Sequence, residues 1–150
     1  MDVDRLIQLW TRIRAGLLDT IDKFSDAELD YRPFDEAYSV RQIMLHIAQE
    51  ELGEIQYGLT RDLDEFPSNI QEADFKTVSE VKGQLSKVHD QTLSYLGTLD
   101  ADSLGEDFEA QWGEKRALID FILHVIEHEV HHRGELSLIL GLLGRKGYDA

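Results

Sequence analysis

The chain has 150 residues, the length of one typical domain, and we expect residues 1–150 to form a single domain with a substantial core. Its 30 acidic and 15 basic residues give a net charge of −15, which argues against nucleic-acid binding because that depends on Lys and Arg neutralising phosphates. The absence of cysteine excludes disulfides, thiolate ligands and a cysteine nucleophile, so any metal ion must be held by nitrogen and oxygen.

The chain shows no targeting or membrane signal. No run of about 18 apolar residues is present, and the first residues lack the basic region and apolar stretch of a signal peptide. We therefore expect no membrane interaction and a cytoplasmic protein.

Four long segments carry the apolar period of an α-helix, and none shows the alternation of a strand. We predict an all-α protein with helices at residues 2–23, 39–59, 77–99 and 116–143. Ser25 and Glu28 fit a capping box that opens a short helix, and Ser39 is a plausible N-cap of the second long helix. Both prolines, Pro33 and Pro67, lie between the predicted helices.

The connections are long for a simple up-and-down bundle, in which two to eight residues are usual. The linker from Thr60 to Lys76 could span a helix of about 30 Å if it were extended. This length permits a parallel crossover between the second and third helices. Such linkers can also supply aromatic walls for a pocket, and the candidates are Tyr31, Phe34, Tyr38, Phe66, Phe75, Phe108 and Trp112.

The second helix carries one histidine, His46, at the edge of its apolar arc. Glu50 lies one turn further along the same line, so it could act as a metal ligand, as an acceptor that orients an imidazole, or as a solvated side chain. An edge position suits a residue that lines a pocket between two helices. His89, on the third helix, lies in a polar stretch, and we expect it at the surface.

The fourth helix holds the main indication of function, because four of the six histidines fall within nine residues. His124, His128 and His132 are spaced i, i+4, i+8, so the outer two are about 12 Å apart and cannot share one ion. Relative to the apolar stripe, His132 is near the centre and His128 about 50° away, whereas His124 and His131 are roughly 90–110° away. His128 and His132 therefore face the interior, either as a metal-binding pair or as hydrogen-bonded core histidines.

A helix-2 histidine followed some eighty residues later by His-x3-His-Arg-Gly resembles the DinB/YfiT-like superfamily of metal-binding four-helix bundles. The resemblance covers the whole chain and implies the crossover topology, a metal site of His46, His128 and His132, and a signature that includes Arg133 and Gly134. Glu135 stands where members often carry Gln, and we expect it to add negative charge without touching a ligand.

Two further expectations concern Arg133 and Gly134. Arg133 is either an ion-pair partner or a substrate anchor. Gly134 costs a helix about 1 kcal/mol relative to alanine, so we expect it to permit close packing against a neighbouring helix. Because family members commonly pair through bundle helices, the resemblance also implies a homodimer.

Three imidazoles would leave a coordination position open, as in catalytic sites. They suit zinc or nickel, with iron or manganese as further options. Characterised relatives use low-molecular-weight thiols, so the leading hypothesis is a metal-dependent thiol transferase. The alternatives are a metal-dependent hydrolase, with Glu50 or Glu129 as base, and a metal-binding bundle without catalysis.

Overall fold

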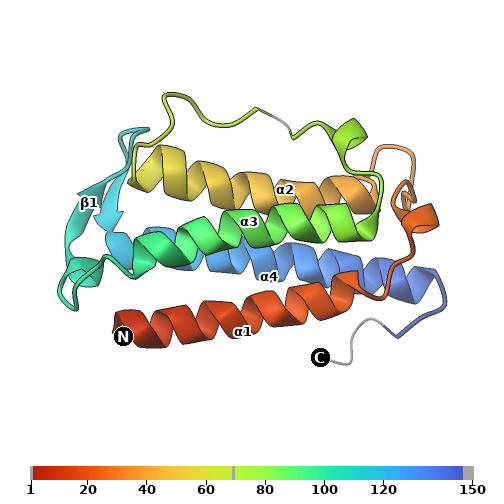
Figure 1. The fold of residues 1–150 in the computed structure, drawn as a ribbon, viewed down its shortest axis with the longest axis horizontal. Coiled ribbons are helices and arrows are strands. Elements are labelled where there is room, and N and C mark those ends of the chain that lie inside the picture. Colours follow the sequence, from red (N-terminus) through yellow and green to blue (C-terminus); the bar gives the residue numbers. More distant parts are fainter. Residues whose placement is uncertain (1, 69, 147–150) are drawn as a thin grey trace.

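The computed structural model describes residues 2–68 and 70–146, and its main feature is four long helices packed side by side (Figure 1). They are α1 (Val3–Ile21), α2 (Val40–Leu52), α3 (Val78–Leu96) and α4 (Leu118–Leu142). A π-helix, Gly53–Leu59, continues α2, and short 3-10 helices occur at Asp26–Glu28, Glu72–Asp74 and Ser103–Gly105. The prediction of an all-α four-helix bundle is confirmed, with helix ends within three residues of those expected.

The direction of the helices confirms the predicted crossover. The linker that follows the π-helix runs along the length of the bundle before α3 begins, so α2 and α3 point the same way (Figure 1). α2 packs against α3 and α4, and α1 packs against the same two helices. The helix that carries His46 therefore lies beside the helix that carries the histidine cluster.

A small hairpin before α4 departs from the expectation that the chain has no strands. Strands β1 (Asp107–Glu109) and β2 (Lys115–Ala117) pair antiparallel, with Phe108 opposite Arg116. Each strand has only three residues, which is too short for an alternating pattern to be recognised. The hairpin closes the end of the bundle at which α4 starts (Figure 1).

Side-chain caps explain where the helices begin. The Ser39 side chain accepts a hydrogen bond from the Gln42 backbone, and the Gln42 side chain accepts one from the Ser39 backbone, which completes a capping box at α2. The predicted box of Ser25 and Glu28 is also present, at the 3-10 helix. Such caps satisfy backbone N–H groups that have no partner within the helix.

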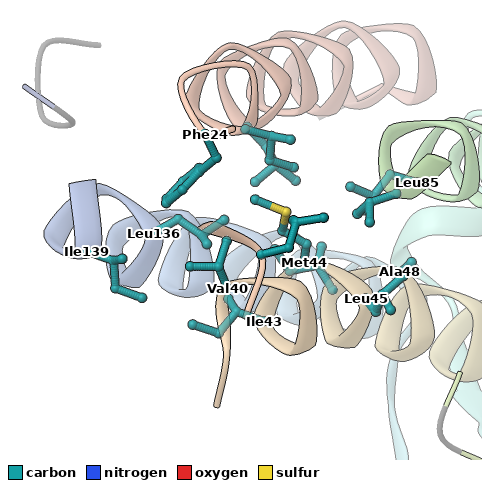
Figure 2. Close-up of a cluster of buried hydrophobic side chains, with 14 of the residues drawn as sticks. Phe24, Val40, Ile43, Met44, Leu45, Ala48, Leu85, Leu136 and Ile139 are labelled. Atoms are coloured by element: carbon teal, nitrogen blue, oxygen red, sulfur yellow. The ribbon is translucent and has the colours of Figure 1, made fainter. Parts of the chain in front are cut away.

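The apolar core consists of two clusters, one in each half of the bundle. The first gathers side chains from all four helices around Met44, Leu85 and Leu136 (Figure 2). The second surrounds Trp10 and Phe121 near the hairpin. In every helix, buried polar or charged residues lie between the parts that contribute to the two clusters: Arg14 in α1, Glu51 in α2, His89 in α3, and Glu129 and His132 in α4.

The expected close packing at Gly134 is not found in the structure. Replacing Gly134 with alanine should therefore stabilise the protein. Gly134 is exposed within α4, and a Cβ there would meet no other atom within 4 Å. We expect the free energy of unfolding to rise by about 0.5–1 kcal/mol in urea denaturation. Gly53→Ala is the contrasting variant, since its Cβ would lie 2.2 Å from the Phe66 ring, and it should destabilise. Equal effects of the two substitutions would contradict this account.

Candidate metal centre

Three histidines from two neighbouring helices converge on one point. The Nε2 atom of His128 lies 3.2 Å from Nε2 of His46 and 3.0 Å from Nε2 of His132. His132 is buried, while His46 and His128 are partly buried. Their ring nitrogens form a group that could hold a metal ion, with each atom within 4.8 Å of the others. The structure thus brings together the three residues that the sequence analysis singled out.

Hydrogen bonding alone does not account for these contacts. A ring nitrogen has either one hydrogen or one lone pair, so Nε2 of His128 cannot bond well to two neighbours at once. Two nitrogens at about 2.0–2.1 Å from one tetrahedral ion are about 3.3–3.4 Å apart, close to the separations seen here. The arrangement and the donor chemistry therefore fit a divalent ion.

Glu135 touches the site, which corrects the expectation that it would contact no ligand. Its Oε2 lies 2.6 Å from Nδ1 of His132. In the tautomer with the proton on Nδ1, Nδ1 donates to the Glu135 carboxylate and Nε2 keeps a lone pair directed at the other two histidines. Carboxylates that orient metal-binding imidazoles in this way are a common feature of metal sites.

Glu50 lies beside Nδ1 of His46 and outside the group of converging nitrogens. Its Oε1 is 3.8 Å from Nδ1 of His46, too long for a hydrogen bond but close enough for a charge interaction. Its oxygens are not in the three-histidine group. This position favours an orienting role for Glu50 over its role as a fourth ligand.

The surroundings favour the uncharged forms of His46 and His128. Burial, followed by the charges of His132 and His46, lowers the pKa of His128 to about 3. Burial and the charge of His132 also lower the pKa of His46. Burial raises the pKa of the Glu50 carboxyl, against the opposing effects of His132 and His124. At neutral pH the imidazole of His128 is therefore free of the proton that would compete with a metal ion.

The metal-free protein should lose stability as the pH falls from about 6.5 toward 3. Between these values the unfolded chain binds a proton at His128 that the folded chain excludes, so acid favours unfolding. Urea denaturation of metal-free protein at pH 7, 6 and 5 should show this fall, and His128→Asn should reduce its slope. His124→Asn, at an exposed position on the same helix, is the control. A slope unchanged by His128→Asn would contradict the expectation.

The other two histidines of the cluster lie outside, as the helical geometry predicts. His124 and His131 are both exposed on α4. Arg133 is only partly exposed, and its guanidinium lies against Gly16 of α1, in an open groove of about 980 Å³ between α1 and α4. It forms no hydrogen bond or ion pair with any residue that the structure describes. The ion-pair role is therefore not seen among these residues, and the role of substrate anchor stays a prediction.

Glu129 is a core residue, which makes the expectation that it could serve as base wrong. Its side chain is 2% exposed, and Oε2 accepts hydrogen bonds from Trp10 Nε1 at 2.8 Å and Arg14 Nη2 at 2.8 Å. Arg14 Nε donates to the other oxygen at 3.0 Å. Both oxygens are therefore engaged inside the bundle.

His89 is also buried, which corrects its expected surface position. Its Nδ1 donates to Glu51 Oε1 at 2.9 Å, and Glu51 Oε2 accepts from Arg14 Nη2 at 2.5 Å. Although burial raises the pKa of Glu51, the bond from His89 and the charge of Arg14 outweigh it and hold that pKa below its usual value. These residues and Glu129, with Trp10, form a polar layer that joins all four helices. One feature of the sequence could have indicated this layer, because Arg14 is a charged residue on the apolar face of α1.

A comparison of the sequence with protein families identifies the family of the chain. The model of the DinB superfamily matches residues 9–136. The chain belongs to the DinB superfamily. None of the curated proteins searched matches this chain.

Solved structures of DinB proteins share the fold. A DinB-like protein from Bacillus cereus ATCC 10987 is 16% identical with a TM-score of 0.77, covering 95% of this chain and 93% of its own. YfiT from Bacillus subtilis, described as a probable metal-dependent hydrolase with an unusual four-helix bundle topology, is 22% identical with a TM-score of 0.64, covering 93% and 87%. A putative DinB family member from Exiguobacterium sibiricum 255-15 is 21% identical with a TM-score of 0.64, covering 97% and 94%.

Within residues 2–68 and 70–146, no helix of this DinB-type bundle combines the length and apolar character that crossing a bilayer requires.

Proposed function

We propose that His46, His128 and His132 hold one divalent metal ion, zinc or nickel in the first place and iron or manganese as alternatives, and that the protein uses it in catalysis. The observation that carries the proposal is the convergence of three Nε2 atoms within contact distance. Three protein ligands leave a coordination position for a reactant, whereas structural zinc sites are closed by four.

The ion would lower the pKa of a thiol or water molecule that takes this position. The protein contributes the rest of the chemistry. Glu135 holds the His132 ring in place, and the raised pKa of Glu50 makes its carboxylate a better proton acceptor than an ordinary glutamate near neutral pH. The Tyr38 ring packs edge to face against that of His46, with 5.8 Å between the ring centres.

The nucleophile we propose is a low-molecular-weight thiol, which makes the protein a metal-dependent thiol transferase. The absence of cysteine is compatible with this choice, because the sulfur would then come from a co-substrate. A small cavity of about 90 Å³ beside His46 supports the choice, because polar side chains, among them Gln42, Gln49 and Glu72, lie in its lining. Gln42 donates to Glu72 there, and a polar reactant would exchange that bond for its own.

A metal-dependent hydrolase is the second candidate, and Glu50 favours it. A carboxylate beside the site with a raised pKa suits a base that takes a proton from attacking water. YfiT, which shares the fold, is described as a probable metal-dependent hydrolase.

Cobalt-substituted protein separates these functions without knowledge of the electrophile. We expect addition of 2-mercaptoethanol to produce sulfur-to-cobalt charge-transfer absorption, and conversion of activated electrophiles to require added thiol. Hydrolysis of activated esters without thiol, with no sulfur-to-cobalt band at millimolar thiol, would favour the hydrolase instead. Neither activity, with metal bound at full occupancy, would indicate a metal-binding bundle without catalysis.

A further inference from the structure

A second group of potential metal ligands lies on the outer side of the three histidines. His131 Nε2 is 3.5 Å from Glu135 Oε1, and His132 Nδ1 is 2.6 Å from Glu135 Oε2. The ligand atoms of these three residues lie within 4.8 Å of one another, so they too could hold an ion. One histidine, His132, belongs to both groups and presents a different ring nitrogen to each.

The two groups differ in their access to solvent. The side chains of His131 and Glu135 are 67% and 43% exposed, whereas that of His132 is only 10% exposed. An ion arriving from solution with its water shell can therefore meet the outer group first. Attraction of cations by a chain of net charge −15 favours this encounter.

We propose that His131 and Glu135, together with His132, form an entry site that captures a divalent cation and passes it to the inner group of His46, His128 and His132. This inference rests on the proposed inner metal site. It gives functions to His131 and to the carboxylate of Glu135 beyond the orientation of His132.

Because both groups share the His132 imidazole, they can hold one ion between them but not two ions at once. Neutral histidine has a single nitrogen lone pair, which lies either on Nδ1, toward the outer group, or on Nε2, toward the inner group. An ion at one position therefore removes His132 from the other. The inner group offers two further imidazoles, in a less exposed setting, so the ion is held more tightly there.

The first test asks whether the outer group binds an ion on its own. Untagged His46→Ala/His128→Ala protein keeps all three residues of the outer group, His131, His132 and Glu135. We expect one equivalent of cobalt(II) to bind weakly to this variant in a calorimetric titration. Adding His131→Ala should weaken this binding by roughly tenfold or more. Equal binding by the double and triple variants would overturn the proposal.

The second test measures loading of the intact inner site. Metal-free wild type, His131→Ala and His124→Ala are mixed with zinc in a stopped-flow instrument with a chromophoric chelator. We expect His131→Ala to load roughly tenfold more slowly, with final stoichiometry and affinity unchanged, because it keeps the bond between Glu135 and His132. His124→Ala removes another exposed histidine of α4 and should load like wild type.

The outcomes separate the two proposals. Equal loading rates of wild type and His131→Ala, with tight binding in both, would overturn the entry site and leave the inner site standing. A wild type that retains no ion after gel filtration would overturn the inner site and the transfer with it.

Discussion

Substitution of His132 with alanine should abolish stoichiometric binding of a divalent ion while the helical content of the protein stays close to that of the wild type. His132 contributes one of three converging nitrogens and is the most deeply buried of the three. Two remaining imidazoles rarely complete a site. Elemental analysis of untagged protein after incubation with zinc and nickel, together with far-ultraviolet circular dichroism, measures both quantities.

His124→Ala provides the matched control, because His124 is one turn from His128 on the same helix but exposed. We expect about one metal equivalent in wild type and in His124→Ala, and none in His132→Ala. Full occupancy in His132→Ala would refute the three-histidine site. Loss of the ion in His124→Ala would assign it to the other histidine pair of α4.

Substitution of Glu129 with alanine should cost about 3–5 kcal/mol of stability, because it leaves the buried Arg14 guanidinium with one carboxylate partner in place of two. The buried Trp10 N–H also loses its acceptor. Urea denaturation at pH 7 measures the change in the free energy of unfolding.

Glu127→Ala is the control for this second prediction. Glu127 is exposed on α4, two residues earlier, and its loss should change stability by less than about 0.5 kcal/mol. The polar layer would not be a stabilising element if Glu129→Ala cost no more than Glu127→Ala.

The four helices could be predicted because their apolar period is long and regular, and because prolines and capping residues mark the connections. The same period predicted that His132 lies on the buried face of α4 and that His124 and His131 lie on its exposed face, as the structure shows. The helical period alone could not show that His46 lies beside the histidines of α4, since even His46 and His128 are 82 residues apart. Only the family resemblance suggested that pairing.

The polar layer was missed for a related reason. Arg14 is separated from Glu51 by 37 residues and from Glu129 by 115, so nothing local shows that these charges meet. A polar stretch of α3 placed His89 at the surface, although its ring faces Glu51 and Trp10. The homodimer, the cytoplasmic location and the thiol co-substrate stay predictions.

The polar layer also fixes how the helices align lengthwise. An apolar bundle can slide by one turn and exchange one leucine contact for another, whereas Arg14 reaches Glu51 and Glu129 in a single alignment of α1, α2 and α4. His46 lies five residues before Glu51, and His128 immediately precedes Glu129. A displacement of one turn, about 5.4 Å, would move His46 out of contact with at least one of the other two histidines. The ion pairs at the centre of the bundle thus determine how far His46 lies from the histidines of α4.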